Sequence, residues 1–363
     1  MKIAFRTDAS LQMGTGHVVR CLTLANELRE RGGKCEFICR EHPGNLIDRI
    51  EQHHFRVVHL PVRHKPPLNT SRSSQAQHLG ADWRTDAHQT LARIDYPTDW
   101  LIVDHYGIDH HWEAYLRPKC KRLMVIDDIA DRRHDCDFLL DQNFGSSVAR
   151  YQRLIPEEAK QLHGPRYALL PKEYAERRAP LTFDADRIRR VMIYFGGGAD
   201  LPNLTGTTVK AFSAPELCDI NLDIVISTNF THRTTLEALV ATRRNATIYE
   251  SLPHLADLLA EADLAVGAGG ATTWERFCLG VPSIVVSIAE NQVPACEALS
   301  EARLINYLGD VRTVTLESMR KTIVDLRASP ERLCEMRSKC MEIVDGRGVL
   351  QVASEIMAAS VSE

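Results

Sequence analysis

The chain has 363 residues, of which 44% are hydrophobic and 25% charged, and its net charge at pH 7 is −4. This length exceeds a single ordinary hydrophobic core, so we expect two domains. The net charge excludes the strongly basic surface that nucleic acids or anionic membranes require, and no apolar run reaches the roughly 18 to 20 residues of a membrane span. The first strand begins without a signal-peptide pattern, which favours a cytoplasmic protein. The 10 cysteines form no CxxC pair, so we expect buried free thiols.

The first half of the chain alternates short apolar runs with segments in which apolar residues recur every three to four positions. The runs predict strands, and the recurring pattern predicts amphipathic helices. The expected elements are strands over residues 3–5, 35–39 and 55–60, helices over 17–31, 44–53 and 81–95, and a polar loop over 63–80. This β-α-β-α-β order predicts a parallel sheet with right-handed crossovers.

Three further strands are expected in this half, and each ends in polar residues. They span residues 100–103, 123–126 and 138–140, and lead into Asp104-His105-Tyr106, Asp127-Asp128 and Asp141-Gln142-Asn143. In an open parallel sheet, ligands bind at the carboxyl ends of the strands. These residues are therefore candidates for a binding site, with helix N-capping as the alternative role for each aspartate.

The second half repeats this architecture after a charged, proline-containing linker over 171–188. Strands are expected over residues 190–195, 222–227, 246–249, 264–267 and 282–286, followed by a helical region over 316–358 that is broken near Gly346 and Gly348. The expected domains are an N-terminal domain over residues 1–175, a C-terminal domain over 190–345 and a final helix over 346–363. Packing of that helix on the first domain is one alternative, which periodicity does not decide.

A Gly-Thr-Gly-His sequence at residues 14–17 joins the first strand to the first helix. Helix N-termini present unsatisfied backbone N–H groups, and Gly14 and Gly16 allow a ligand to approach them closely. His17 would project into the same space from the first turn of the helix. The alternative is a tight turn that carries a surface histidine.

Two glycine-rich turns in the second half are candidates for binding phosphate. The turn at residues 196–198 follows a strand, but it fits neither a Walker A motif nor a dinucleotide fingerprint. The run at 266–276 is more specific, since its glycines and threonines at a helix start suit a pyrophosphate, and Glu275 suits ribose hydroxyls. In the alternative, Thr272 and Glu275 form only a helix capping box, which leaves the glycines and Asn291-Gln292 unexplained.

Taken together, these motifs resemble one enzyme family. The residues that carry the resemblance are Arg6-Thr7-Asp8-Ala9-Ser10, Gly14-Thr15-Gly16-His17, Arg20-Cys21-Leu22, Val125-Ile126-Asp127-Asp128, Asp141-Gln142-Asn143, the turn at 196–198, Gly267-Ala268-Gly269-Gly270, Thr273-Trp274-Glu275-Arg276 and Asn291-Gln292. In this order, over residues 1 to about 345, they resemble the UDP-2,4-diacetamido-2,4,6-trideoxy-β-L-altropyranose hydrolases of pseudaminic acid biosynthesis. That family is similar to the GT-B glycosyltransferases, including the UDP-GlcNAc transferase that makes lipid II. The resemblance implies an α/β, GT-B-like fold, in which two Rossmann-like lobes with parallel sheets face each other across a cleft.

The resemblance also implies roles for individual residues. His17 would be the base that activates water, while UDP would bind the second lobe. The implied UDP-binding residues are Gly197, Gly198, Ile248, Gly270, Ala271, Thr272, Glu275 and Asn291. The implied sugar-binding residues are Asp8, Gly14, Gly16, Tyr106, Asp128 and Gln292. There are two departures from the family, because Ala271 replaces an expected serine and the loop over 63–80 has no counterpart.

The implied reaction is hydrolysis of UDP-2,4-diacetamido-2,4,6-trideoxy-β-L-altropyranose, with water attack at the anomeric carbon, inversion and release of UDP. UDP is a good leaving group, so the reaction needs mainly a positioned water, a base and positive potential at the phosphates. No histidine or acidic cluster has metal-ligand spacing, so we expect no metal and no cofactor, and we expect His53-His54 and His110-His111 to be surface residues. A UDP-sugar glycosyltransferase and a non-catalytic sugar-nucleotide-binding protein are the alternatives. The sequence leaves the amino sugar accepted and the oligomeric state open.

Overall fold

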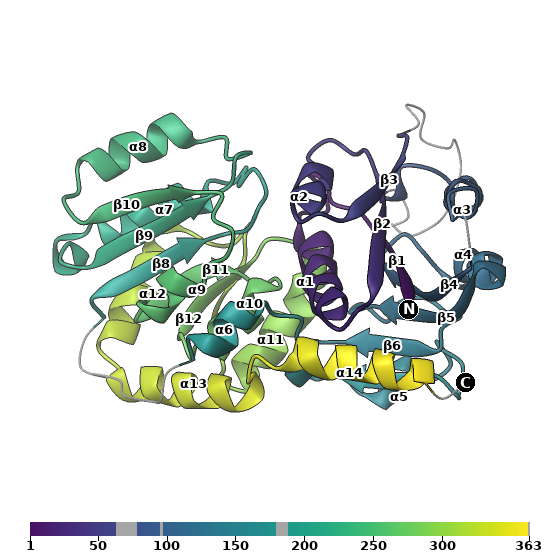
Figure 1. Ribbon diagram of the computed structural model, residues 1–363. Coiled ribbons are helices and arrows are strands. Elements are labelled where there is room, and N and C mark those ends of the chain that lie inside the picture. The colour runs from purple at the N-terminus through teal and green to yellow at the C-terminus, as the bar shows by residue number, and fades with distance from the viewer. Residues whose placement is uncertain (63–77, 95–96, 179–187, 362–363) are drawn as a thin grey trace. The chain divides into compact units, whose positions relative to one another are not determined.

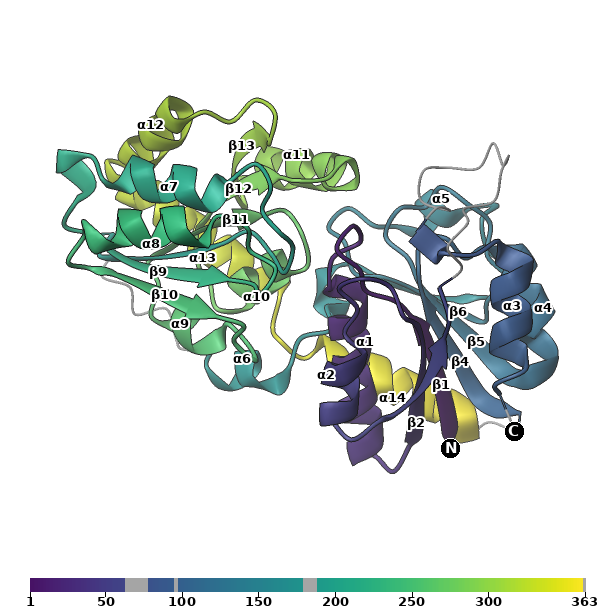
Figure 2. The same cartoon turned by 90° about the horizontal axis from the view of Figure 1, so that it is seen from above.

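The computed structural model describes residues 1–62, 78–94, 97–178 and 188–361. It divides into two compact units, with unit 1 formed by Met1–Leu169 and Gly348–Glu363 and unit 2 by Leu170–Arg347. Each unit is a parallel sheet with helices packed on it, so the expected class of two Rossmann-like α/β lobes is confirmed (Figure 1 and Figure 2). The loop expected over 63–80 lies outside the described residues as far as residue 77, and so do residues 179–187 of the expected linker.

Unit 1 contains a seven-stranded sheet in which all strand pairs are parallel, in the order β3-β2-β1-β4-β5-β6-β7. The strands are β1 (Lys2–Thr7), β2 (Lys34–Arg40), β3 (Arg56–Leu60), β4 (Thr98–Asp104), β5 (Cys120–Ile126), β6 (Phe138–Asp141) and β7 (Lys160–His163). Strands β1 to β6 lie where the apolar runs predict them. The sequence does not predict β7, because Lys-Gln-Leu-His contains a single apolar residue.

Helices cover both faces of this sheet (Figure 1). They are α1 (Gly16–Glu30), α2 (Ile47–Gln52), α3 (Trp83–Leu91), α4 (His110–Leu116), α5 (Val148–Tyr151) and α14 (Gly348–Val361). Alternate residues of β1 point to opposite faces of the sheet. Ile3 and Phe5 lie in one hydrophobic core with residues of α1, α2 and α14. Ala4 lies in another core with residues of α3 and α4. The strands are thus buried on both sides, which explains their continuous apolar sequences.

The final helix, α14, belongs to unit 1 although it follows unit 2 in the chain. Its residues in the unit 1 core are Val349, Val352, Ala353 and Ile356. Polar contacts also hold it, because Arg31 Nη1 donates to Ser354 Oγ and Trp100 Nε1 donates to Ser360 Oγ, each at 2.8 Å. The helix is therefore an integral layer of this unit.

Unit 2 contains a six-stranded sheet, also with parallel strand pairs, in the order β10-β9-β8-β11-β12-β13. The strands are β8 (Arg190–Tyr194), β9 (Asn221–Ile226), β10 (Ala246–Glu250), β11 (Leu264–Ala268), β12 (Ser283–Ser287) and β13 (Asn306–Asp310). Strands β8 to β12 lie where the sequence predicts them. The sequence does not predict β13, because Asn-Tyr-Leu-Gly-Asp gives no apolar run. In the structure all five residues of this strand are half-buried.

The helices of unit 2 differ from the expectation at two places. They are α6 (Lys172–Glu176), α7 (Leu204–Phe212), α8 (Arg233–Ala241), α9 (Ala256–Ala260), α10 (Thr272–Cys278), α11 (Val293–Glu301), α12 (Leu316–Arg327) and α13 (Pro330–Ile343). The chain enters unit 2 at Leu170, a few residues before the expected boundary, because α6 packs on this unit. The helical region expected over 316–358 also breaks before Pro330, which starts α13.

Two expectations concern the chain as a whole. All 10 cysteines are free thiols, and six of them are buried. The expected burial is wrong for Cys218, which is exposed, and for Cys35, Cys120 and Cys334, which are half-buried. Within the described residues, no helix has the length and apolar character to cross a membrane.

Candidate active site

Two buried polar side chains meet at the carboxyl edge of the unit 1 sheet. His17 lies in the first turn of α1 soon after β1, and Asp104 is the last residue of β4. Because β1 and β4 are neighbours in the sheet, His17 Nδ1 lies 2.6 Å from Asp104 Oδ1. His17 is 5% exposed and Asp104 is 0% exposed. The predicted histidine is thus held by a carboxylate from a different part of the chain.

Arg20, one turn after His17 on α1, holds the same carboxylate. Its Nε donates to Asp104 Oδ2 at 2.6 Å and its Nη2 to Asp104 Oδ1 at 2.7 Å, while its Nη1 donates to Asp128 Oδ2 at 3.0 Å. Burial alone would raise the pKa of Asp104, but the charge of Arg20 and the hydrogen bond from His17 outweigh it and hold that pKa below its usual range. Asp104 is therefore ionised at neutral pH.

The ionised state of Asp104 determines which nitrogen of His17 carries the proton. A carboxylate only accepts hydrogen bonds, so the 2.6 Å contact requires a proton on His17 Nδ1. In the neutral imidazole, Nε2 then has the lone pair and can accept a proton from water. The ring of Tyr106 packs edge-to-face on the imidazole, with 4.4 Å between the ring centroids. The arrangement defines a histidine oriented as a general base.

Tyr106 and Asp128, both predicted as sugar contacts, lie at the same edge. Tyr106 follows β4 and Asp128 follows β5, and these strands pair in parallel. Burial and the Asp128 carboxylate raise the pKa of Tyr106, so its hydroxyl keeps its proton at neutral pH. A hydroxyl group and a carboxylate thus lie at the sheet edge that carries His17, with Tyr106 against the imidazole and Asp128 against Arg20.

Asp8, also predicted as a sugar contact, lies in a buried ion-pair network. It is 1% exposed, and its Oδ1 accepts from the Arg40 backbone N–H at 2.6 Å and lies 2.7 Å from Arg6 Nη1. Its Oδ2 lies 3.4 Å from His105 Nε2 and 3.7 Å from His42 Nε2. Burial would raise the pKa of Asp8, but Arg6 and the two histidines lower it. Both oxygens of Asp8 thus face protein groups of unit 1.

The turn before His17 has the open geometry that its glycines predict. Gly14 has φ +77°, a left-handed conformation that favours glycine, and nothing lies within 4 Å of the position that a Cβ would take there. Gly16 is the first residue of α1, and among the described residues no side chain caps this helix at Thr15. The first N–H groups of α1 therefore lie open beside His17.

The sequence does not predict that Asp104 and Arg20 hold His17. It offers Asp104 only as one of several candidate residues at strand ends, and Arg20 only as part of a family motif. The available signal was the i, i+3 spacing of His17 and Arg20, which places both on one face of a helix. That face adjoins the neighbouring strand, which ends in Asp104.

In unit 2, the turn between β11 and α10 combines tight packing with an uncapped helix. A Cβ on Gly269 would lie 2.2 Å from Cys296 Sγ, so only glycine fits at this position. The helix begins at Thr272, and none of the described side chains caps it, so the capping-box alternative is wrong. Within the described part of the chain, the backbone N–H groups of residues 270–272 have no acceptor. They are available to an anion.

Three further predicted residues lie at or near this turn. Gln292 Nε2 lies 3.6 Å from the position that a Cβ on Gly270 would take. Glu275, in the first turn of α10, accepts a hydrogen bond from Tyr174 Oη at 2.6 Å, and burial and this carboxylate raise the pKa of Tyr174. Asn291 is exposed. Gln292 thus lies beside Gly270, and Glu275 lies in the helix turn that follows the predicted pyrophosphate position.

The predicted phosphate glycines Gly197 and Gly198 follow β8, which pairs with β11, so they lie at the same edge. The helix after them is not open to an anion. The Asp200 carboxylate accepts hydrogen bonds from the backbone N–H groups of Leu204 and Thr205, each at 2.9 Å. A phosphate near these glycines would therefore bind without the N-terminus of α7.

Ile248, predicted to lie near uracil, is in the middle of β10, the edge strand of the unit 2 sheet. Its side chain is half-buried and packs against the hydrophobic core. The carboxyl ends of the strands are at the edge that carries the glycine turns. Residues after Glu250, rather than Ile248 itself, reach that edge.

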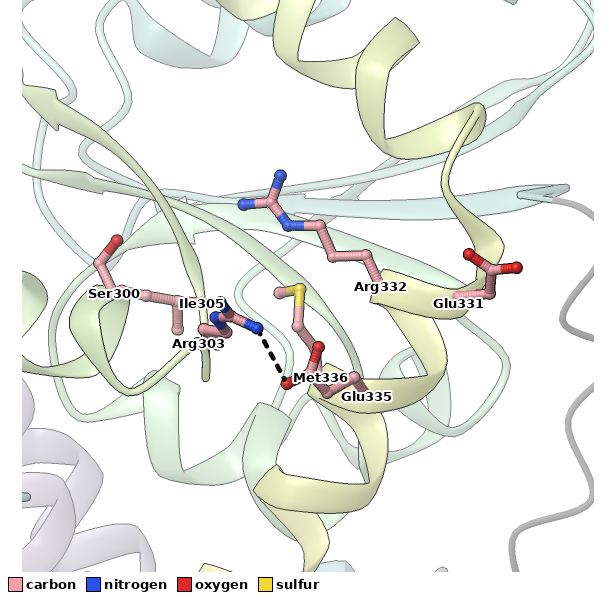
Figure 3. Close-up of a pocket in the computed structure, with 7 residues that line it drawn as sticks. All are labelled: Ser300, Arg303, Ile305, Glu331, Arg332, Glu335 and Met336. Atoms are coloured by element: carbon pink, nitrogen blue, oxygen red, sulfur yellow. Dashed lines mark ion pairs between the residues drawn. The ribbon is translucent and has the colours of Figure 1, made fainter.

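A cavity of about 440 Å³ lies elsewhere in unit 2 (Figure 3). Its lining residues are Ser300, Arg303, Ile305, Glu331, Arg332, Glu335 and Met336. Arg303 and Ile305 precede β13, so the cavity lies at the amino edge of the sheet, opposite the glycine turns. It contains none of the predicted site residues.

Asp109, His110 and His111 form a group whose ligand atoms lie within 4.8 Å of one another. His111 is exposed, as expected, whereas His110 and Asp109 are half-buried. The Asp109 side chain accepts a hydrogen bond from the His111 backbone N–H at 3.0 Å and so caps α4. This capping role accounts for the position of the carboxylate.

The fold is that of the GT-B glycosyltransferases. MurG of Acinetobacter baumannii superimposes with a TM-score of 0.63 at 15% identity, covering 98% of this chain and 99% of that chain. The glycotransferase of kitacinnamycin superimposes with a TM-score of 0.64 at 18% identity, covering 98% of each chain. At these identities the similarity is one of fold alone.

Relatives in sequence are distant, and no family model matches the chain. An uncharacterized protein of Methanocaldococcus jannaschii is 26% identical over 294 residues, covering 79% of this chain and 55% of that protein, so the chain spans about half the length of this relative. The spore coat polysaccharide biosynthesis protein SpsG of Bacillus subtilis is 21% identical over 356 residues, covering 98% of this chain and 97% of that protein. The UDP-2,4-diacetamido-2,4,6-trideoxy-β-L-altropyranose hydrolase of Campylobacter jejuni is 22% identical over 294 residues, covering 80% of this chain and 93% of that protein. The predicted resemblance to this hydrolase is confirmed as a distant homology.

Proposed function

We propose that the protein hydrolyses a UDP-sugar to UDP and the free sugar. The observation that supports this best is the buried pair of Asp104 and His17, because a histidine with Nε2 as an acceptor can act as a general base. The name of the Campylobacter jejuni relative, at 22% identity, supports UDP-2,4-diacetamido-2,4,6-trideoxy-β-L-altropyranose as the substrate.

In the proposed reaction, His17 Nε2 takes a proton from a water molecule while the water oxygen bonds to the anomeric carbon. The bond between that carbon and the β-phosphate oxygen of UDP breaks, and UDP leaves with the electron pair. Attack opposite to UDP inverts the anomeric centre. Asp104 stabilises the imidazolium that forms, and Arg20 keeps Asp104 ionised.

UDP would bind unit 2 through residues at the carboxyl edge of its sheet. The backbone N–H groups of Gly270, Ala271 and Thr272 would hold the diphosphate, and Glu275 would accept from the ribose hydroxyls. The exchange of the expected serine for Ala271 removes a hydroxyl but leaves the backbone donor. Further proposed contacts are Gly197, Gly198 and Asn291 for UDP and Gly14, Gly16, Tyr106, Asp128 and Gln292 for the sugar.

The test is UDP release from the UDP-sugar in buffer that contains EDTA and no acceptor. We expect the wild-type protein to release UDP, and we expect His17→Ala to lower kcat by at least about a hundredfold, because general base catalysis contributes factors of this order. His59→Ala, which changes a half-exposed histidine on β3, is the control and should keep wild-type activity.

Each alternative gives a different result in this assay. A transferase would release UDP only when an acceptor is added, and a binding protein would bind UDP and release none from the substrate. Undiminished activity in His17→Ala would overturn the role given to His17. Measurement of the product anomer by NMR tests the inversion.

A further inference from the structure

Arg276 is a buried cation on α10 that has no ion pair with any described carboxylate. It is 2% exposed. Its Nη2 donates to the Ala268 carbonyl and to Thr273 Oγ1, each at 2.8 Å. Its Nε, also buried, has no acceptor among the described residues. The contacts of this guanidinium are therefore all with neutral groups.

A buried charge of this kind is costly to the fold unless an anion compensates it. In unit 1, the buried side chains of Arg6 and Arg40 both lie within 2.7 Å of a carboxylate oxygen of Asp86. Arg276 has no such partner, and burial lowers its pKa to about 10. The negative charge of Glu275 opposes this shift, but Arg276 forms no ion pair with a carboxylate in the described part of the molecule.

The guanidinium lies next to the glycine turn. A Cβ on Gly267 would lie 3.1 Å from Arg276 Nη1, and Nη2 binds the carbonyl of the next residue, Ala268. The backbone N–H groups of residues 270–272, which are open to an anion, follow directly. Glu275 is the nearest acid in the sequence, but its carboxylate binds Tyr174. The buried guanidinium and the open backbone donors therefore belong to one turn.

We infer that Arg276 is the fixed positive charge of a diphosphate site, which makes this turn prefer a nucleoside diphosphate to an uncharged nucleoside. Arg276 is a positioning residue, because it acts from beneath the turn through the Ala268 carbonyl and through its field. The inference rests on the UDP site of the proposed function, and it supplies the positive potential that a departing UDP requires. Buried charges are screened little by salt, so this preference should persist at physiological ionic strength.

The test is calorimetric titration of the full-length protein with UDP and with uridine. We expect Arg276→Met to raise the Kd for UDP at least tenfold and to change the Kd for uridine less than twofold, since uridine lacks the phosphates. Arg276→Lys keeps the charge and should bind UDP within threefold of wild type. Arg243→Met is the matched control, because Arg243 is also held by backbone carbonyls in unit 2, and it should leave both affinities unchanged.

Equal loss of UDP and uridine binding in Arg276→Met would mean a purely structural role and would overturn the inference, as would unchanged UDP binding. If circular dichroism shows that Arg276→Met does not fold, Arg276→Lys decides: a tenfold loss of UDP binding in that variant overturns the inference, and retention supports it. UDP release by the wild-type protein is measured separately. Binding of UDP without release overturns the proposed function alone, whereas unchanged UDP affinity in Arg276→Met overturns this inference alone.

Discussion

The proposed base, His17, depends on Asp104, which lies 87 positions later in the sequence. The turn and the helix start that carry His17 are local, so the sequence predicts them. Which nitrogen of His17 carries the proton is not determined locally, because it depends on the pairing of β1 with β4 and on the charge of Arg20. For this reason a sequence motif can point to the histidine but not to the carboxylate that orients it.

Replacement of Asp104 by asparagine tests this dependence. We expect Asp104→Asn to lower kcat for UDP release by at least about a hundredfold, because an amide neither fixes the tautomer nor stabilises an imidazolium. The affinity for UDP, which we assign to unit 2, should change less than twofold. Steady-state kinetics and calorimetry measure the two effects.

The control for that variant lies on the same strand. Asp99, in the amino-terminal half of β4, accepts a hydrogen bond from the Lys2 backbone N–H at 2.7 Å, far along the strand from His17. Asp99→Asn should therefore keep wild-type kcat. Full activity in Asp104→Asn, or a similar loss in both variants, would contradict the role of Asp104.

Among the secondary-structure elements, α14 shows most clearly how the fold depends on distant segments. Its buried residues complete a core to which β1 and α1 also contribute, and these come from the opposite end of the chain. The periodicity of its sequence predicts a helix. It does not reveal which apolar surface the helix covers, since any apolar partner satisfies the same pattern.

Truncation of a buried side chain in α14 tests its contribution. Ile356 is 0% exposed, so Ile356→Ala should lower the free energy of unfolding by about 3 kcal/mol through lost burial and a cavity. Leu350 in the same helix is 40% exposed, and Leu350→Ala should cost less than about 1 kcal/mol. Urea unfolding followed by circular dichroism measures both, and equal effects would contradict the packing of α14.

Other elements show where sequence reasoning stops. Among the described residues, eleven strands follow apolar runs and are predicted. Strands β7 and β13 are short and largely polar, and only pairing with a neighbour makes them strands. In the candidate site, the glycine turns and Glu275 are local signals and are predicted. The burial of Arg276 depends on packing, so the sequence does not indicate it. The contacts of Asp200 with Leu204 and Thr205, which close the start of α7, are local in the sequence.

In the molecule as a whole, buried carboxylates make opposite contributions to the pH dependence of folding. Burial would raise the pKa of Asp127, but Arg132 and His134 lower it to about 2. Asp127 therefore stabilises the fold at pH values above the usual aspartate pKa, and this stabilisation is lost as the pH falls towards 2. Asp141 differs, because burial raises its pKa to about 6. Tyr151 Oη lies 2.9 Å from Asp127 Oδ2 and 3.1 Å from Asp141 Oδ2. Arg150 Nη1 also donates to Asp141 Oδ2 at 2.9 Å, so Asp141 is protonated below about pH 6 and ionised above it.

A neutral residue at position 141 tests this assignment. A folded pKa above the unfolded value means that Asp141 stabilises the fold below about pH 4 and that this stabilisation is lost as the pH rises to about 6, by roughly 3 kcal/mol in total. Asp141→Asn removes the titration. Its stability relative to wild type should therefore rise between pH 4 and pH 6.5. Urea midpoints measured across this range check the prediction, and parallel pH profiles of the two proteins would contradict it.

The place of α14 in the chain has a consequence for biosynthesis. A ribosome delivers residues 1–169 first, then the whole of unit 2, and only afterwards the helix that completes the core of unit 1. Unit 2 has all of its residues before that moment and can fold during translation. Unit 1 remains without the cover that Val352, Ala353 and Ile356 provide, so its nascent sheet is the part of the polypeptide that chaperones would need to shield.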